Sequence, residues 1–172
     1  MKVLVVLDLN GTILDSTHKR RAGVDQDAMA RKKYVYFRPY MHEFLAYLFT
    51  HEDIDVAVWT SNIRANAEAI VQCAFQPYQV QQLKFIMSRS DCELGPNYSS
   101  FKHVNKIPER LPDSTYDQIL IIDDSVATES KIVPRNYQGW LPIPTYQASS
   151  ASKQYDGELF RMRYLLNAII NT

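Results

Sequence analysis

The chain has 172 residues, 46% of them hydrophobic and 22% charged, with 19 basic and 19 acidic side chains. This length and composition indicate one globular domain, residues 1–172, and argue against disorder or a fibrous repeat. A net charge of zero gives no general field for binding nucleic acid, and the apolar runs are far shorter than the roughly 20 residues of a membrane helix, so we expect neither a nucleic-acid partner nor a membrane segment.

The first predicted element is a strand over residues 3–7, whose continuously apolar side chains suit a strand covered on both faces. The N-terminus enters this strand directly, without the longer apolar stretch and cleavage site of a secretion signal, so we expect an intracellular protein, cytoplasmic or nuclear. Asp8 follows the strand, and Gly11 soon permits a tight turn. Residues 16–34 are polar and charged, which predicts a short flap or loop insertion with a solvated surface.

Short apolar runs over residues 56–59, 85–87 and 119–122 predict three more strands. Most of the segments between them have the apolar spacing of helices. Alternation of this kind predicts an α/β fold with a parallel central sheet. The flap is too short to be a large cap domain, so we expect an open site that admits a polypeptide loop.

Helix ends are predicted from residues that favour the first turn or the cap. Pro39 is the expected first residue of one helix, Asn62 the cap of the next, and Ser125 the cap of a short later one. A polar linker over residues 149–153 precedes a last helix over residues 154–171.

Cysteine and histidine usage gives no sign of zinc or redox chemistry. Cys73 and Cys92 have neither metal-ligand nor dithiol spacing, so we interpret them as buried structural thiols. The four histidines are scattered, and none has a partner at zinc spacing.

Polar residues follow the predicted strands. Asp8 comes after the first, Thr60 after the second, and the pair Asp123 and Asp124 after the fourth. Because ligands of an open parallel sheet bind beyond the carboxyl ends of its strands, we expect these groups to converge. Two adjacent carboxylates at the end of a buried strand repel each other and call for a cation. Together with Asp8 they indicate a metal site.

Two lysines compete for a place beside these carboxylates. Lys102 lies in the segment Phe101-Lys102-His103-Val104, and Lys106 follows four residues later. From spacing alone, a solvated surface role for Lys102 is about as well supported as a catalytic one, because lysine is usually exposed.

This order and spacing resemble the HAD superfamily. Over about the whole chain they are similar to phosphatases of the NLI-interacting-factor type, which include small carboxy-terminal-domain phosphatases and Dullard-like proteins. Further similar segments are Arg38-Pro39 with Phe44-Leu45, Arg89-Ser90-Asp91-Cys92, Asn97-Tyr98, and Asp123-Asp124-Ser125 before Pro134-Arg135-Asn136. The resemblance implies a HAD-like, Rossmannoid three-layer fold, with a central mostly parallel sheet flanked by helices. It also implies Mg²⁺-dependent hydrolysis of phosphoserine or phosphothreonine in a protein or peptide.

The resemblance also implies a role for each site residue. Asp8 would be the nucleophile that accepts the phosphoryl group, and Thr60 and Lys102 would contact the phosphoryl oxygens. Mg²⁺ would be held by Asp8, Asp124 and the backbone carbonyl of Asn10, with Asp123 orienting Lys102 or a bound water from behind. Ser61 and Arg89 would contact the substrate, although the residues by themselves slightly favour a solvent-facing or structural role for Arg89.

Asn10 departs from the family pattern, which has a second aspartate at this position. That aspartate protonates the leaving oxygen and later deprotonates water, and an amide can do neither, which removes about 10²- to 10⁴-fold in rate. Three explanations remain: a natural pseudophosphatase that binds phosphoproteins as a scaffold module, an enzyme with another acid, or a substitution introduced to trap a complex. Asp15 and His18 are the nearest titratable substitutes, but we interpret both as ordinary loop residues.

Overall fold

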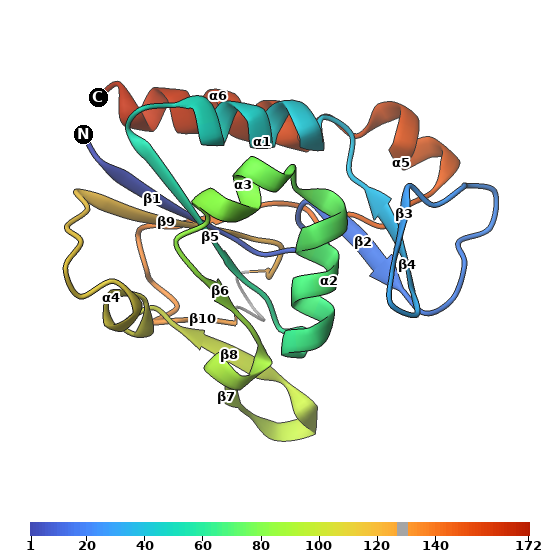
Figure 1. Ribbon diagram of the computed structural model, residues 1–172, viewed down its shortest axis with the longest axis horizontal. Coiled ribbons are helices and arrows are strands. Elements are labelled where there is room, and N and C mark those ends of the chain that lie inside the picture. The colour runs from blue at the N-terminus through green and yellow to red at the C-terminus, as the bar shows by residue number, and fades with distance from the viewer. Residues whose placement is uncertain (127–130) are drawn as a thin grey trace.

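A computed structural model describes residues 1–126 and 131–172. Its centre is a five-stranded sheet in the order β11-β9-β1-β5-β6, with every neighbouring pair parallel (Figure 1). These strands are β1 (Val3–Leu7), β5 (Ile54–Trp59), β6 (Ile86–Met87), β9 (Gln118–Asp123) and β11 (Trp140–Pro142). The predicted α/β class is confirmed, as are the four predicted strands within two residues at either end.

Helices cover one face of this sheet. They are α1 (Met41–Thr50), α2 (Arg64–Ala74), α3 (Pro77–Gln82) and α6 (Glu158–Ile170). Because successive side chains of a strand point to opposite faces, Val5 and Leu7 of β1 meet this layer, where they share an apolar cluster with Leu45, Ile70 and Met162. The cluster fixes the helices against the sheet and holds the strand ends in place.

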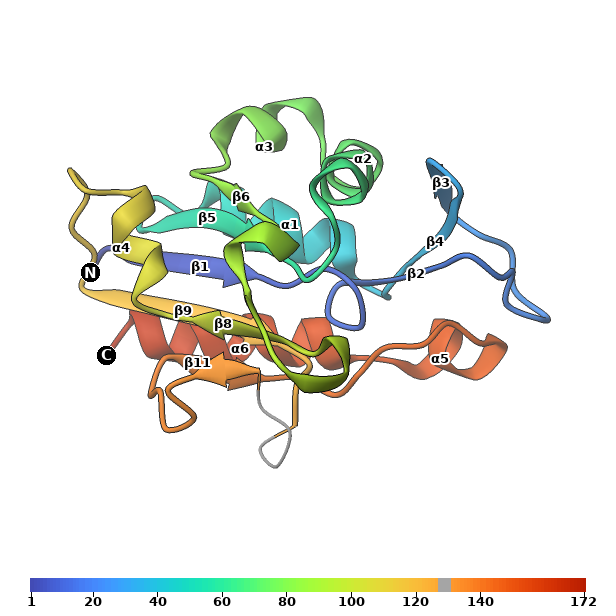
Figure 2. The same cartoon turned by 90° about the horizontal axis from the view of Figure 1, so that it is seen from below.

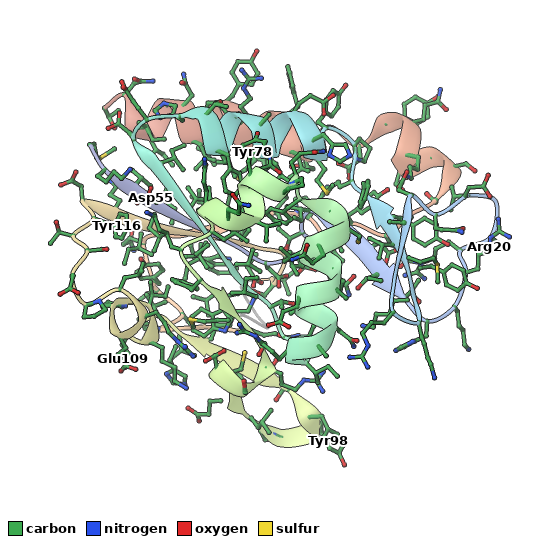
Figure 3. The ribbon with its side chains drawn as sticks, viewed as in Figure 1. Arg20, Asp55, Tyr78, Tyr98, Glu109 and Tyr116 are labelled. Carbon is green, nitrogen blue, oxygen red and sulfur yellow. The ribbon has the colours of Figure 1, made fainter. Side chains whose placement is uncertain are left out.

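The other face carries α4 (Lys106–Arg110) and a second sheet of three short strands, β7 (Glu93–Leu94), β8 (Ser100–His103) and β10 (Ile132–Val133). Leu4 and Val6 of β1 pack here with Ile107 and Ile132. The tip of the β7–β8 segment carries Tyr98, whose side chain projects fully into solvent (Figure 3). A central sheet covered on both faces accounts for the continuously apolar strands.

The predicted flap is a small folded sheet. Its strands β2 (Leu14–Thr17), β4 (Lys33–Phe37) and β3 (Ala28–Ala30) are antiparallel in the order β2-β4-β3. Figure 2 shows this flap extending past one end of the central sheet, on the side of α2. Asp15 anchors the flap to the rest of the chain. The Asp15 carboxylate accepts hydrogen bonds from Arg21 at 2.9 and 3.1 Å and from the amide of Ala148 at 3.0 Å.

Two predicted helix starts are wrong. Helix α1 begins at Met41 rather than at Pro39, because Tyr40 before it is in the left-handed region, with φ of 66°. Ile63, not Asn62, is the N-cap residue of α2, and the Asn62 side chain is engaged in the candidate site instead.

The predicted bounds of the C-terminal helix are also wrong. The residues expected as linker belong to helix α5 (Ser150–Tyr155), in which the amide of Ser152 donates to the hydroxyl of Ser149 at 3.0 Å. The last helix is α6 alone, so the predicted span of 154–171 is too long at its start. The short helix predicted after Ser125 falls on residues 127–130, outside the described residues.

The described residues include no helix that is long and apolar enough to cross a membrane. Cys92 is buried and Cys73 is half-buried, and both thiols are free. Burial raises the pKa of both thiols, which fits their interpretation as structural residues.

Candidate active site

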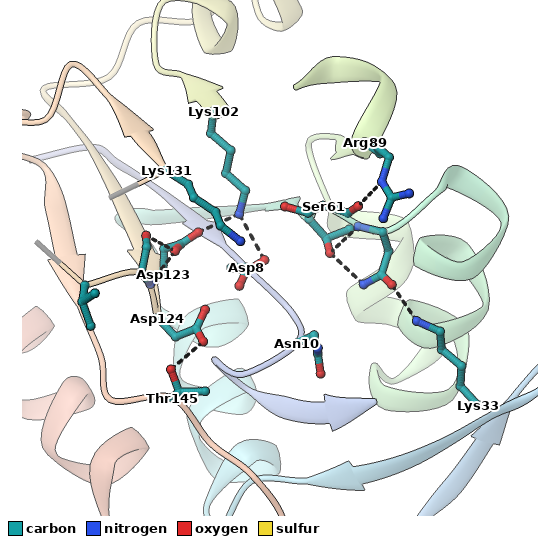
Figure 4. Close-up of a pocket in the computed structure, with 14 residues that line it drawn as sticks. Asp8, Asn10, Lys33, Ser61, Arg89, Lys102, Asp123, Asp124, Lys131 and Thr145 are labelled. Atoms are coloured by element: carbon teal, nitrogen blue, oxygen red, sulfur yellow. Dashed lines mark hydrogen bonds and ion pairs between the residues drawn. The ribbon is translucent and has the colours of Figure 1, made fainter. Parts of the chain in front are cut away.

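The carboxyl ends of the central strands open into a cavity of about 500 Å³ (Figure 4). Asp8 directly follows β1, Thr60 directly follows β5, and Asp123 is the last residue of β9, so parallel pairing brings all three to one edge. Every residue predicted for the site lines this cavity, namely Asp8, Asn10, Thr60, Ser61, Arg89, Lys102, Asp123 and Asp124.

Lys102 is the buried cation of the site. It stands on β8, and its ammonium donates to Asp123 Oδ2 at 2.7 Å and to Asp8 Oδ1 at 3.1 Å. Burial by itself would lower the pKa of Lys102, but the carboxylates of Asp123 and Asp8 outweigh it and raise that pKa above its usual range. Lys106 does not line the cavity, and its ammonium donates to the carbonyl of Asp91 at 3.2 Å. The geometry therefore favours Lys102 over Lys106.

Asp8 is held at both oxygens. Lys102 donates to Oδ1, and the buried hydroxyl of Thr12 donates to Oδ2 at 3.1 Å. Burial raises the pKa of the Asp8 carboxyl to about 7; Lys102 opposes the shift, and the charges of Asp123 and Asp124 add to it. A cation beside these groups would restore the ionised form that a nucleophile needs.

The three carboxylates are close enough to share one cation. One oxygen from each of Asp8, Asp123 and Asp124 lies within 4.8 Å of the others. The ammonium of Lys102 is paired with two of these carboxylates, Asp8 and Asp123, and Asp124 has no ion pair with a basic side chain among the described residues. Oxygen ligands of this kind suit Mg²⁺, which also keeps several waters.

Asp123 and Asp124 differ in how many partners they have. Asp123 accepts from Lys102 at one oxygen and from both the amide and the hydroxyl of Ser125 at the other. Lys102 and Ser125 outweigh burial and lower the pKa of Asp123. Asp124 accepts from the hydroxyl of Thr145 at 2.9 Å, and its other oxygen has no hydrogen-bond partner among the described residues. Asp124 is therefore the better placed of the two to bind a cation directly.

Gly11 allows the loop that follows β1 to approach Asp124. Its φ is +82°, and a Cβ atom at this position would lie 2.2 Å from Asp124 Oδ2. A larger residue would strain the backbone and displace the carboxylate.

Arg38 fixes the same loop from behind. Its buried guanidinium donates to the carbonyl of Thr12 at 2.9 Å and makes two bonds to Asp156, at 2.9 and 3.0 Å. Asp156 lies between α5 and α6, so the C-terminal helices are tied to the loop that carries Asp8.

The hydroxyl of Thr60 acts as a hydrogen-bond acceptor for Asn62 and can still donate its hydrogen into the cavity. Its Oγ1 accepts from the amide of Asn62 at 3.2 Å and from the side-chain nitrogen of Asn62 at 3.0 Å. Two accepted bonds leave the hydrogen available to a ligand oxygen. The hydroxyl of Ser61 pairs with that of Ser100 at 2.9 Å, which fixes the next residue of the segment.

Asn10 lines the cavity with its side chain directed away from Asp8 (Figure 4). Its Oδ1 accepts from the amide of Ser16 in the flap at 2.7 Å. Neither possible substitute acid lines the cavity: Asp15 is paired with Arg21, and His18 is exposed.

Several site residues were missed by sequence reasoning. Thr12, Asn62 and Thr145 hold Asp8, Thr60 and Asp124, respectively, and Lys33 and Lys131 also line the cavity. Thr12 is close to Asp8 in sequence and could have been found there. Thr145 is 21 residues from Asp124, and no local pattern connects them.

This arrangement of a buried aspartate, a buried lysine and paired carboxylates at the edge of a parallel sheet fits a HAD-type phosphatase domain. The chain belongs to the NLI interacting factor-like phosphatase family, which it matches over residues 3–172. No curated protein matches the chain.

Solved structures share its fold. The structure of Fcp1, an essential RNA polymerase II CTD phosphatase, has a TM-score of 0.56 at 16% identity over 95% of this chain and 49% of that one. A fission yeast Fcp1 variant bound to beryllium fluoride has a TM-score of 0.54 at 14% identity over 99% and 51%. The Legionella pneumophila effector Ceg4 has a TM-score of 0.53 at 14% identity over 95% of each chain. This chain spans about half the length of the two Fcp1 chains.

Proposed function

We propose that the chain is a Mg²⁺-dependent phosphatase domain that acts on phosphoserine or phosphothreonine in a protein. An oxygen of Asp8 attacks phosphorus, the bond from phosphorus to the seryl or threonyl oxygen breaks, that oxygen takes a proton from water, and a phospho-Asp8 intermediate results. Water then hydrolyses this intermediate and releases phosphate. The observation that carries the proposal is the buried pairing of Asp8 with Lys102 in a cluster of three carboxylates.

The residues present fit a magnesium ion. Asp8, Asp124 and the carbonyl of Asn10 would hold it, and bound there it would offset the negative charge of the phosphoryl oxygens. Lys102 neutralises the same region from the other side, and Thr60 offers a hydroxyl hydrogen to a phosphoryl oxygen.

The substrate class follows from the open site and from the relatives. The flap is a small sheet at one end of the molecule, and among the described residues no larger cap domain interrupts the fold (Figure 2). An open cavity admits a phosphorylated side chain on a polypeptide. Two of the similar structures are of an RNA polymerase II CTD phosphatase, which supports a phosphoprotein substrate for this chain.

Asn10 limits the rate of both steps. Its amide neither donates a proton to the leaving oxygen nor accepts one from water, so a poor leaving group and the hydrolysis of phospho-Asp8 are both slowed. The same residue favours a second candidate function, a catalytically weak module that binds phosphoproteins. Phosphate affinity and metal binding survive in that case, but turnover does not.

The test is a rapid-mixing experiment with an activated aryl phosphate and Mg²⁺. Because such a substrate has a good leaving group, it needs little acid, and Asp8 becomes phosphorylated even with Asn10 in place. We expect a burst of about one product per protein followed by a slow steady rate, because hydrolysis lacks its base. Asp8→Asn should remove the burst, and Asp113→Asn, on an exposed loop, should keep it. A chain with no burst would be a binding module.

A further inference from the structure

Lys33 and Arg89 both line the cavity, on either side of the segment that follows Thr60, and neither is in an ion pair among the described residues. Lys33 is the first residue of β4 in the flap, and Arg89 is the first residue of the short helix η1 (Arg89–Asp91) after β6. Burial lowers the pKa of Lys33, and the charge of Arg89 lowers it further, so the two cations are close enough to repel each other. Like charges brought together favour an anion between them.

Neutral groups hold both cations in place. The ammonium of Lys33 donates to Asn62 Oδ1 at 3.0 Å, and Nε of Arg89 donates to the carbonyl of Ser61 at 2.9 Å. Each side chain is thus anchored to the segment that follows Thr60, with further N–H groups left over. Because the two side chains are already anchored, they lose less conformational entropy when an anion binds.

Two other cations of the flap, Arg20 and Arg21, are neutralised by carboxylates of the chain itself. Arg20 is paired with Asp25 at 2.6 Å and Arg21 with Asp15 at 2.9 Å. Neither arginine lines the cavity, and the pairing accounts for them as flap structure. Lys33, in contrast, lines the cavity, and among the described residues its ammonium contacts an amide oxygen and no carboxylate.

Lys33 and Arg89 lie across the cavity from the carboxylates. Figure 4 shows Asp123 and Asp124, with Lys102 and Lys131 beside them, on one side and Lys33 and Arg89 on the other, with Ser61 between them. A phosphoryl group positioned for attack by Asp8 would be contacted by Lys102 and Thr60, which leaves Lys33 and Arg89 for another part of the ligand. A cavity of about 500 Å³ has the volume of a small-ligand site and exceeds what one phosphate needs.

We propose that Lys33 and Arg89 form a subsite for a second anionic group of the substrate. The preferred ligand is a phosphopeptide that carries a carboxylate or a second phosphate beside the phosphorylated residue. This inference rests on the proposed function and adds to it the charge of the flanking sequence. Lys33 supplies a positive charge from the flap, and Arg89 supplies one from the edge of the central sheet.

The test uses the 172-residue chain with Asp8→Asn, so that no peptide is consumed, and measures peptide affinity by fluorescence anisotropy with Mg²⁺. Four peptides share one core: phosphoserine with neutral flanks, phosphoserine with two glutamates, a doubly phosphorylated form, and the glutamate peptide without phosphate. The variants are Lys33→Gln, which keeps an amide donor for Asn62, and the control Lys32→Gln, which removes the neighbouring exposed charge outside the cavity.

We expect at least one of the two doubly anionic phosphopeptides to bind about fivefold more tightly than the neutral-flank one, with the preference weakened by salt. Comparing those two tells a carboxylate from a second phosphate as the recognised group. Lys33→Gln should bring the ratio close to one while keeping the affinity for the neutral-flank peptide, and Lys32→Gln should leave it unchanged. Lys33→Glu should reverse the preference, so that a fifth peptide, phosphoserine with two lysines, binds more tightly than the doubly anionic ones.

Equal affinities for all phosphopeptides, or a preference that persists in Lys33→Gln and is not reversed in Lys33→Glu, would overturn the subsite and leave the proposed function intact. If phosphorylation does not improve the binding of any peptide, the proposed function fails first and the subsite with it.

Discussion

Asn10 and Ser16 are joined by a hydrogen bond of 2.7 Å between the side-chain oxygen of the first and the backbone amide of the second. This bond links residue 10, where the family pattern has an aspartate, to the flap, and it keeps the Asn10 side chain away from Asp8 (Figure 4). An aspartate here has nearly the same shape and could accept the same bond. The two residues therefore show how a carboxylate could be restored without rebuilding the loop.

Removal of the charge of Asp124 should abolish Mg²⁺ binding. In the wild type, Mg²⁺ at ten times its Kd should add about 1.4 kcal/mol to the free energy of unfolding, and so raise Tm by a few degrees. Asp124→Asn keeps an acceptor for Thr145 but should show no such rise. Differential scanning fluorimetry with and without Mg²⁺ measures this, with Asp113→Asn as control. A rise of the same size in Asp124→Asn would remove Asp124 from the metal site.

Substitution of the two competing lysines should separate their roles. Beryllium fluoride resembles a phosphoryl group on a carboxylate, so it should bind Asp8 in the presence of Mg²⁺ without any need for proton transfer. Lys102→Met should weaken this binding by about 10-fold or more, because a buried charge-assisted contact is lost. Lys106→Met should leave it within about twofold, because Lys106 lies outside the cavity and its ammonium contacts the carbonyl of Asp91 instead. Fluorine NMR reports the bound species, and equal losses in both variants would contradict the assignment.

Asp55 should make the free energy of unfolding depend on pH in the acidic range. Its carboxylate accepts from the hydroxyl of Tyr116 at 2.9 Å and pairs with Lys2 and Lys84 at 3.1 and 3.3 Å (Figure 3 labels Asp55 and Tyr116). Burial by itself would raise the pKa of Asp55, but these partners outweigh it and lower the pKa. A lowered pKa means that the stabilisation is complete above the unfolded pKa of about 3.9 and is lost as pH falls through the folded value.

The variant Asp55→Asn should therefore cost about 1 kcal/mol at pH 7 and almost nothing at pH 2.5. Urea unfolding of both proteins at the two pH values checks this. The idea is wrong if the difference between the proteins stays the same across that range.

Arg38 and Asp156 should be coupled in stability. Arg38→Met leaves the carboxylate of Asp156 and the carbonyl of Thr12 without their donor, which should lower the free energy of unfolding by about 3 kcal/mol. Asp156→Asn, whose side chain is partly exposed, should cost less. A double-mutant cycle in urea should give a coupling of about 1–3 kcal/mol, whereas additive losses would show that the pair does not act as a unit.

The central sheet and the acidic residues of the site could be predicted because their signals are local. Four apolar runs identify four strands, and in a parallel sheet the residues directly after strands meet at one edge. The strands β7 and β10 have two residues each, too few for any periodicity to show. The flap sheet was hidden in the same way by its polar and short strands.

The burial of Lys102 could not be predicted from its surroundings in the sequence. Its partners Asp8 and Asp123 are 94 and 21 residues away, and only the fold brings them within 3.1 Å. For Asn62 the local sequence was misleading. Its position before a helix predicts a cap, but its side-chain nitrogen donates to the hydroxyl of Thr60 instead.

The central claim is that every part of a phosphatase except the proton-transfer group is in place, and Asn10→Asp tests it most directly. The restored carboxylate would act as acid for the leaving group and as base for water, so phosphoserine peptide hydrolysis should rise by about 10²-fold or more in kcat. The gain should be smaller for an aryl phosphate, whose leaving group depends less on the acid. Asp8→Asn in the same background should abolish the gain.

The measurement is steady-state hydrolysis of both substrates by wild type and Asn10→Asp under saturating Mg²⁺. The account predicts a large gain that is larger for the seryl than for the aryl phosphate. If Asn10→Asp binds Mg²⁺ as the wild type does yet hydrolyses neither substrate faster, the account is contradicted.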